Sequence, residues 1–166
     1  MKNILKTIVL TVCLCFAVPA LGFATPAWAQ GMPPAMDFGP RENLTIISNG
    51  ATHTFSIEVA DTQAELSRGM MFRDVVAPNE GMLFEFGDER VVSIWMKNTS
   101  VFLDIIFVRA DGRILKIEHS AKPYSLRSIT SEAPVTAVFE IAGGQANALG
   151  IRPGDIVQHS YFSTAP

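Results

Sequence analysis

Short apolar stretches separated by turn-forming residues run along the chain from residue 44 onward. In the segment TFSIEV (54–59) polar and apolar side chains alternate, which is typical of a strand with one buried face. The dipeptides Asn49-Gly50 and Asp111-Gly112 favour tight turns between strands. The pattern predicts about eight short strands, at residues 44–47, 55–59, 82–86, 91–96, 103–108, 114–119, 135–141 and 156–162.

Two short helices are expected between these strands. Thr62 and Glu65 have the spacing of a capping box, and Gly69 stands where a short helix would end. A second short helix is expected within residues 143–149. The predicted fold class is therefore mainly β (α+β), a compact barrel-like mixed or antiparallel sheet of about eight short strands with one or two short helices.

The N-terminus has the features of an export signal. Lys2 and Lys6 precede an apolar stretch at residues 8–21. Ala27-Trp28-Ala29 then fits the small-x-small pattern before a cleavage point. The apolar stretch is shorter than the roughly 20 residues of a spanning helix, although an uncleaved anchor is the alternative. We predict a signal peptide over 1–29 and a periplasmic or extracellular protein. A flexible tether (30–43), a single β-rich domain (44–162) and a tail (163–166) are expected to follow.

Cleavage of this signal would change both the thiol content and the charge. Cys13 and Cys15 would be removed, so that no disulfide, thiol nucleophile or thiolate metal site would remain. Of the 13 basic residues, two lie in the signal peptide, which leaves 11 against 16 acidic residues and a net charge of −5. This charge argues against a nucleic-acid partner. We also expect no membrane span after cleavage, and a monomer.

One charged residue is out of place in its surroundings. Asp104 interrupts the apolar run FLDIIF (102–107), where a strand should be wholly buried. A buried carboxylate requires an ionic partner or hydrogen bonds. One hypothesis is structural: Asp104 accepts backbone N–H bonds from the loop 97–100 and holds it. The other is functional and compatible with the first: a pocket lined by Arg68, Arg73, Trp95, Lys97, Asn98 and Asp104.

The side chains of this hypothetical pocket suit polar ligands. Trp95 beside amide and carboxylate groups could bind a sugar, although packing in the core is the simpler explanation. The guanidinium groups of Arg68 and Arg73 suit a carboxylate or phosphate, either on a ligand or on an internal partner such as Glu85 or Asp104.

Metal and enzyme signals are weak. Met70, Met71, Met82 and Met96 carry soft thioethers that could bind Cu(I), but methionine is also a common core filler. The three histidines are widely spaced, and the usual hydrolase and nucleotide-binding motifs are absent. No metal and no cofactor are expected.

Four segments together resemble a known family. SRGMMFR (67–73), EGMLFEF (80–86), WMKNTSVFLDIIFV (95–108) and ALGIRPGDIV (148–157) occur in this order, which resembles domain-of-unknown-function family 192. The resemblance covers roughly residues 44–160 and implies a compact β-rich fold. It implies no catalytic residues.

The prediction from sequence is an exported domain that binds a small polar or anionic envelope ligand (sugar-like, or bearing a carboxylate or phosphate), or a partner protein, without catalysis. In this hypothesis Lys97, Asn98 and Asp104 form the polar centre and Trp95 an apolar wall. Whether the protein is an enzyme stays open: the alternative is a metal-independent hydrolase or lyase acting through Asp104 and Lys97. A structural accessory protein without a ligand is the third alternative.

Overall fold

The computed structural model describes residues 35–162. The predicted signal peptide and tail lie outside this part of the chain. Nine strands and two short helices follow in the order β1 (Glu42–Ser48), β2 (Ala51–Ala60), α1 (Gln63–Arg68), β3 (Glu80–Arg90), β4 (Ser93–Ile94), β5 (Leu103–Val108), β6 (Ile114–Ala121), β7 (Ile129–Thr130), β8 (Val135–Ala142), α2 (Gln145–Leu149) and β9 (Ile156–Gln158). The predicted mainly-β fold is confirmed, and neither described helix is long and apolar enough to cross a membrane.

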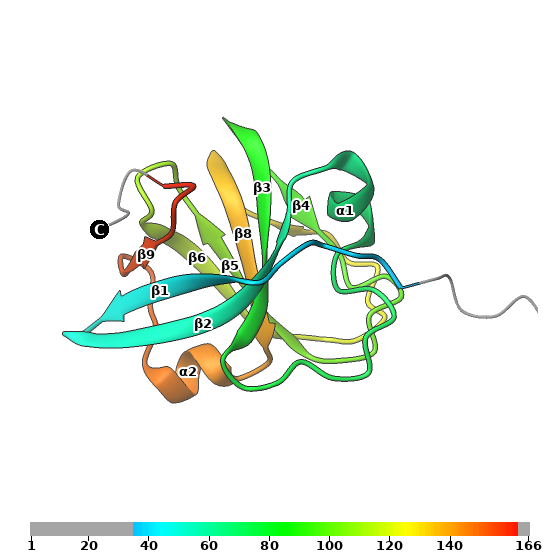
Figure 1. Cartoon of the computed structure of the whole chain (residues 1–166), viewed down its shortest axis with the longest axis horizontal. Coiled ribbons are helices and arrows are strands. Elements are labelled where there is room, and N and C mark those ends of the chain that lie inside the picture. Colours follow the sequence, from blue (N-terminus) through cyan, green and yellow to red (C-terminus); the bar gives the residue numbers. More distant parts are fainter. Residues whose placement is uncertain (1–34, 163–166) are drawn as a thin grey trace, which may run out of the picture. The chain divides into compact units, whose positions relative to one another are not determined.

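Seven strands form one mixed sheet in the order β6-β5-β8-β3-β2-β1-β9, and β4 pairs separately with β7 (Figure 1). All neighbours in the large sheet are antiparallel except β2 and β3. The sheet curls into a half-barrel whose edge strands meet at one end. There Ile114 N donates to Asp155 O at 2.9 Å and Val157 N donates to Gly112 O at 2.8 Å.

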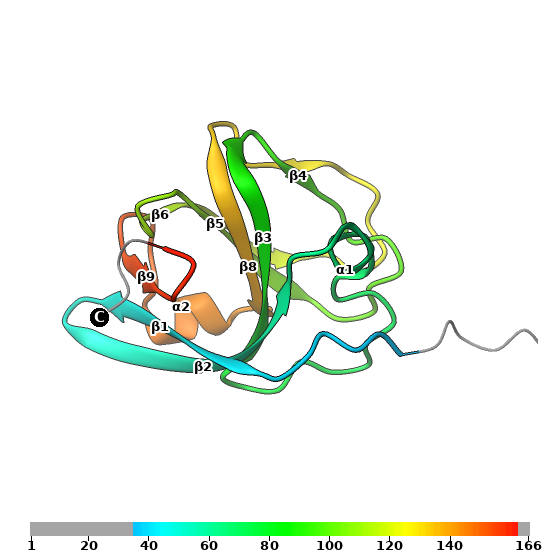
Figure 2. The ribbon, with the colours of Figure 1, turned by 45° about the horizontal axis from the view of Figure 1, so that its top comes forward.

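Strands β5 and β8 are buried on both faces, as is β3 over residues 81–84. Phe139 belongs to the core inside the half-barrel, whereas its neighbour Val138 belongs to a second core on the outer face. Successive side chains of a strand point to opposite faces, so this arrangement requires near-continuous apolar sequence. Helix α2 covers the inner core through Ala146, and α1 covers the outer core through Leu66 (Figure 2).

The predicted capping box begins α1. Glu65 N donates to Thr62 Oγ1 at 3.3 Å, and Thr62 N donates to Glu65 Oε2 at 3.0 Å. The Glu65 carboxylate also accepts a hydrogen bond from Thr62 Oγ1 at 2.8 Å, and the two bonds it accepts from Thr62 hold the pKa of Glu65 below its usual value. The helix ends at Gly69, whose φ of 45° is unfavourable for other residues.

Several strands extend beyond their predicted bounds, and the largest differences concern two shortened strands and one strand that was not predicted. The predicted strand 91–96 pairs only over Ser93–Ile94, because β3 continues to Arg90 and Met96 N instead bonds to Ser125 O in a loop. The predicted strand 156–162 ends at Gln158. Strand β7 was not predicted, because its two residues are too few to create an alternating pattern.

Candidate functional site

Asp104 is a structural residue of β5. Its side chain is 0% exposed, and its carboxylate accepts backbone N–H bonds from Ser120 (2.7 Å), Gly144 (2.9 Å) and Ala146 (2.8 Å). The prediction of backbone hydrogen bonds is confirmed, but the donors are not in the loop 97–100. They belong to the end of β6 and the start of α2, so Asp104 ties this short helix to the sheet.

The structure does not bring Lys97, Asn98 and Asp104 together into the polar centre that the sequence predicts. Lys97 is exposed, and its ammonium lies 5.1 Å from the ring centroid of Trp95. Asn98 Nδ2 donates weakly to Met71 Sδ at 3.8 Å. Asp104 shares its face of the sheet with Ile106, in the inner core, so the acid–base pair of Asp104 and Lys97 has no geometric basis.

The two predicted arginines have internal contacts. The Arg68 guanidinium carbon lies 4.7 Å from the centroid of the Phe72 ring. Arg73 pairs with Glu58 at 2.5 Å and lies 5.5 Å from the centroid of the Phe38 ring. An internal ionic partner was expected for these arginines. For Arg73 it is Glu58 on β2 rather than Glu85 or Asp104.

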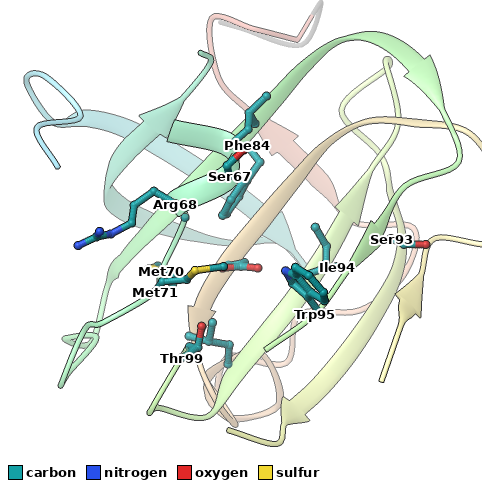
Figure 3. Close-up of a pocket in the computed structure, with 13 residues that line it drawn as sticks. Ser67, Arg68, Met70, Met71, Phe84, Ser93, Ile94, Trp95 and Thr99 are labelled. Carbon is teal, nitrogen blue, oxygen red and sulfur yellow. The ribbon is translucent and has the colours of Figure 1, made fainter. Parts of the chain in front are cut away.

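Arg68 and Trp95 do line a common cavity of about 110 Å³ on the outer side of the sheet. One wall is the end of α1 with the turn after it, and the opposite wall is β4 with Trp95. Figure 3 shows Met70 and Met71 facing Trp95, while the Arg68 guanidinium points away from it. The cavity is lined by Leu66, Ser67, Arg68, Gly69, Met70, Met71, Phe84, Ser93, Ile94, Trp95, Thr99, Leu103 and Glu140.

Glu140 is the residue of this cavity that the sequence analysis missed. It lies on β8, is 4% exposed, and is surrounded by apolar side chains of the outer core. Burial raises the pKa of its carboxyl to about 8, and the charge of Arg73 lowers it only in part. Among residues 35–162 no hydrogen-bond donor reaches this carboxyl. The sequence does contain a signal, because Glu140 interrupts the apolar strand VTAVFEIA as Asp104 interrupts FLDIIF.

Strand register explains why Arg73 influences Glu140. Glu58 on β2, Met82 on β3 and Glu140 on β8 are consecutive partners across the sheet. All three therefore project from the same face, with the two carboxyl groups on either side of Met82. Arg73 neutralises Glu58 directly, whereas Glu140 has no ionic partner within 4.0 Å in the described chain.

A second polar cluster lies around His159, after β9. Its Nε2 lies 3.0 Å from Glu42 Oε2, and its Nδ1 lies 3.7 Å from Glu85 Oε1. Burial, with smaller contributions from the charges of Asp61 and Glu42, raises the pKa of Glu85 to about 7. No group of three or more acidic, histidine or cysteine side chains in residues 35–162 has the arrangement of a metal site.

Comparisons with known proteins agree with the fold. The profile of the DUF192 family, described as "Uncharacterized ACR", matches residues 44–159. A crystal structure of a candidate transcription regulator from Sinorhizobium meliloti 1021 is 38% identical, with a TM-score of 0.72 over 74% of this chain and 95% of that one. A crystal structure of a protein of unknown function from Novosphingobium aromaticivorans DSM 12444 is 37% identical, with a TM-score of 0.71 over 82% of this chain and 99% of that one. No curated protein matches the chain significantly.

Proposed function

Since the chain belongs to the DUF192 family, whose biochemical role is not established, we propose a function from the cavity itself: non-catalytic recognition of a small polar ligand, or of a polar side chain on a partner protein, with Glu140 as the central contact. We propose further that this recognition takes place in the periplasm or outside the cell. The predicted signal peptide supports that location.

The observation that carries the proposal is the buried carboxyl of Glu140. Burial of a carboxyl group disfavours its ionised form, so ionisation of Glu140 destabilises the folded protein. Glutamine or an apolar residue at this position would remove the ionisable group. A destabilising ionisable group beside a cavity is typical of a functional site.

The other walls of the cavity fit a recognition role. Trp95 is 51% exposed at the rim, so its ring is accessible to a ligand. Thr99 is buried and supplies a hydroxyl group, and Met70 and Met71 supply flexible apolar surface that adapts to a bound group. One buried polar group among apolar walls fixes the orientation of a ligand, as small-molecule sites generally do.

A role in transcription regulation, as named for the S. meliloti protein, is less well supported. The chain has a net charge of −3 with its N-terminal segment included, whereas nucleic-acid-binding domains are usually strongly basic.

A ligand screen by nuclear magnetic resonance tests the proposal. The full chain is labelled on its seven methionine methyl groups, and sugars, amino acids, amines, carboxylates and phosphates are added one at a time. We expect at least one compound class to shift the Met70 and Met71 signals saturably, and Glu140→Gln to weaken that binding. A screen in which no compound shifts these two signals would overturn the proposed function.

A further inference from the structure

We propose that the cavity binds a cation, specifically a primary ammonium group on an aliphatic stem, and that Glu140 is its carboxylate partner. This inference rests on the proposed function and names the ligand class of the same site.

The distribution of charge around the cavity favours a cation. Glu140 and Arg68 are the two charged side chains of its lining. The guanidinium of Arg68 stacks on Phe72 and points away from Trp95 (Figure 3), and that of Arg73 pairs with Glu58. A bound anion would therefore meet a carboxyl group at the buried end of the cavity. An ammonium group would find there the acceptor that matches it.

The apolar walls also suit a cation. Trp95 and Phe84 contribute aromatic rings, whose faces attract positive charge, and Met70 and Met71 contribute polarisable sulfur atoms. Trp95 already attracts one ammonium group: Lys97, which does not line the cavity, has its Nζ 5.1 Å from the ring centroid. A carboxylate beside aromatic rings is the combination used by proteins that recognise organic ammonium ions.

An aliphatic stem has space to leave the cavity. A neighbouring groove of about 130 Å³ is lined by Ser93, Ile94, Trp95, Leu126 and Ser128. It shares Ser93, Ile94 and Trp95 with the cavity, so the two lie next to each other, and we infer that a stem leaving the cavity runs along this groove. The stem can belong to a free amine or to a lysine side chain of another protein, and the chemistry at Glu140 is the same.

The ionisation of Glu140 makes the binding of a cation depend on pH. The pKa of Glu140 is raised to about 8, so about one side chain in ten is ionised at pH 7, and binding of an ammonium ion releases the remaining proton to solvent. Three other charged groups bear on this site: Arg73, whose charge lowers the pKa of Glu140; Arg68, which lines the same cavity; and Glu58, which lies on the same face of the sheet. Cation affinity should increase about 50-fold from pH 6 to pH 8. A ligand that accepts a hydrogen bond from the neutral carboxyl should instead bind more weakly at the higher pH.

Three probes of similar size and different charge separate these cases: n-butylammonium, n-butanol and butyrate. Each is titrated into the methionine-labelled full chain at pH 6 and pH 8, and the Met70 and Met71 signals are followed. Glu140→Gln removes the carboxylate while keeping its shape. Glu85→Gln is the matched control, because Glu85 has a raised pKa but lies outside this cavity.

We expect butylammonium to shift the Met70 and Met71 signals saturably, with an affinity that is higher at pH 8 than at pH 6. Glu140→Gln should weaken this binding at least tenfold at pH 8, and Glu85→Gln should leave it unchanged. Trp95→Ala is a second, independent test at a half-exposed position of the cavity rim, and it too should weaken binding. Nα-acetyl-lysine methylamide distinguishes the sources, since tighter binding than butylammonium indicates a lysine on a protein.

Two results would overturn the inference. If butanol or butyrate binds and butylammonium does not, the ligand is not a cation, although the proposed recognition site remains. If none of the three probes shifts Met70 or Met71, the ammonium assignment is wrong, and the broader screen described above decides separately whether the cavity binds any ligand.

Discussion

Replacing Glu140 with glutamine should stabilise the protein, and the gain should grow with pH. In the unfolded chain this carboxyl titrates near its ordinary pKa of 4.5, whereas burial raises its pKa to about 8 in the folded protein. Between these two values the unfolded chain binds fewer protons than the folded protein. The wild-type protein therefore loses stability as the pH rises through this window.

The magnitude follows from the two pKa values. Each unit of difference corresponds to about 1.4 kcal/mol, so the loss is about 1 kcal/mol at pH 5 and about 4 kcal/mol at pH 8. Glutamine does not titrate. The difference in unfolding free energy between Glu140→Gln and wild type should consequently become about 3 kcal/mol more favourable to the variant between these pH values.

Urea unfolding of the full chain at pH 5 and pH 8 measures this difference. Glu89→Gln, at an exposed position of the neighbouring strand β3, is the control for the loss of one carboxyl group, and its effect should stay within about 0.5 kcal/mol at both pH values. An equal effect of Glu140→Gln at both pH values would contradict this expectation. It would mean that Glu140 ionises in the folded protein as easily as in the unfolded chain.

Three further predictions address other parts of the structure. Asp104→Asn should lower the unfolding free energy by about 3 kcal/mol, because an amide cannot accept all three backbone N–H bonds; unchanged urea unfolding would contradict its structural role. Gly81→Ala should lower the melting temperature, because the new Cβ would lie 2.6 Å from Glu140 O, and an unchanged value would mean that β3 and β8 move apart easily. Asp61→Asn should lower the pKa of Glu85 below about 7, because the charge of Asp61 is the second contribution after burial; carbon-13 titration of Glu85 would detect no change if that contribution were absent.

Local sequence patterns predicted much of the fold. The capping box at Thr62 and Glu65 and the turn at Asn49-Gly50 depend on residues close together in sequence, and both are present. The family assignment from short motifs was also correct. The two-residue strand β7 and the shortened strand at 91–96 depend on pairing between distant segments, which no local pattern reports.

The sequence marks Asp104 and Glu140 as unusual but does not show that their roles differ. Both are acids within apolar strands, so sequence alone marks each as anomalous. Their roles differ because β5 and β8 present them to opposite faces of the sheet, where Asp104 meets the amino end of α2 and Glu140 meets a cavity. The register that decides this joins residues far apart in the chain, such as Asp104 and Ile141.

The structure brings only some residues of the predicted pocket together, for a related reason. Arg68 and Trp95 line one cavity, but the partner of Arg73 is Glu58, which lies 15 residues earlier on another strand. An arginine near an apolar motif does not reveal which carboxylate it will contact. Only the sheet arrangement shows that Glu58 is paired and Glu140 is not.

Carbon-13 titration of the Glu140 side-chain carboxyl, with and without n-butylammonium, would show whether this carboxyl has a raised pKa and whether it binds an ammonium ion. We expect the Glu140 carboxyl to have a pKa near 8 in the free protein and a value at least one unit lower when the amine is bound, because binding and ionisation are linked. A free-protein pKa near 4.5, or a raised pKa that the amine leaves unchanged, would contradict the account.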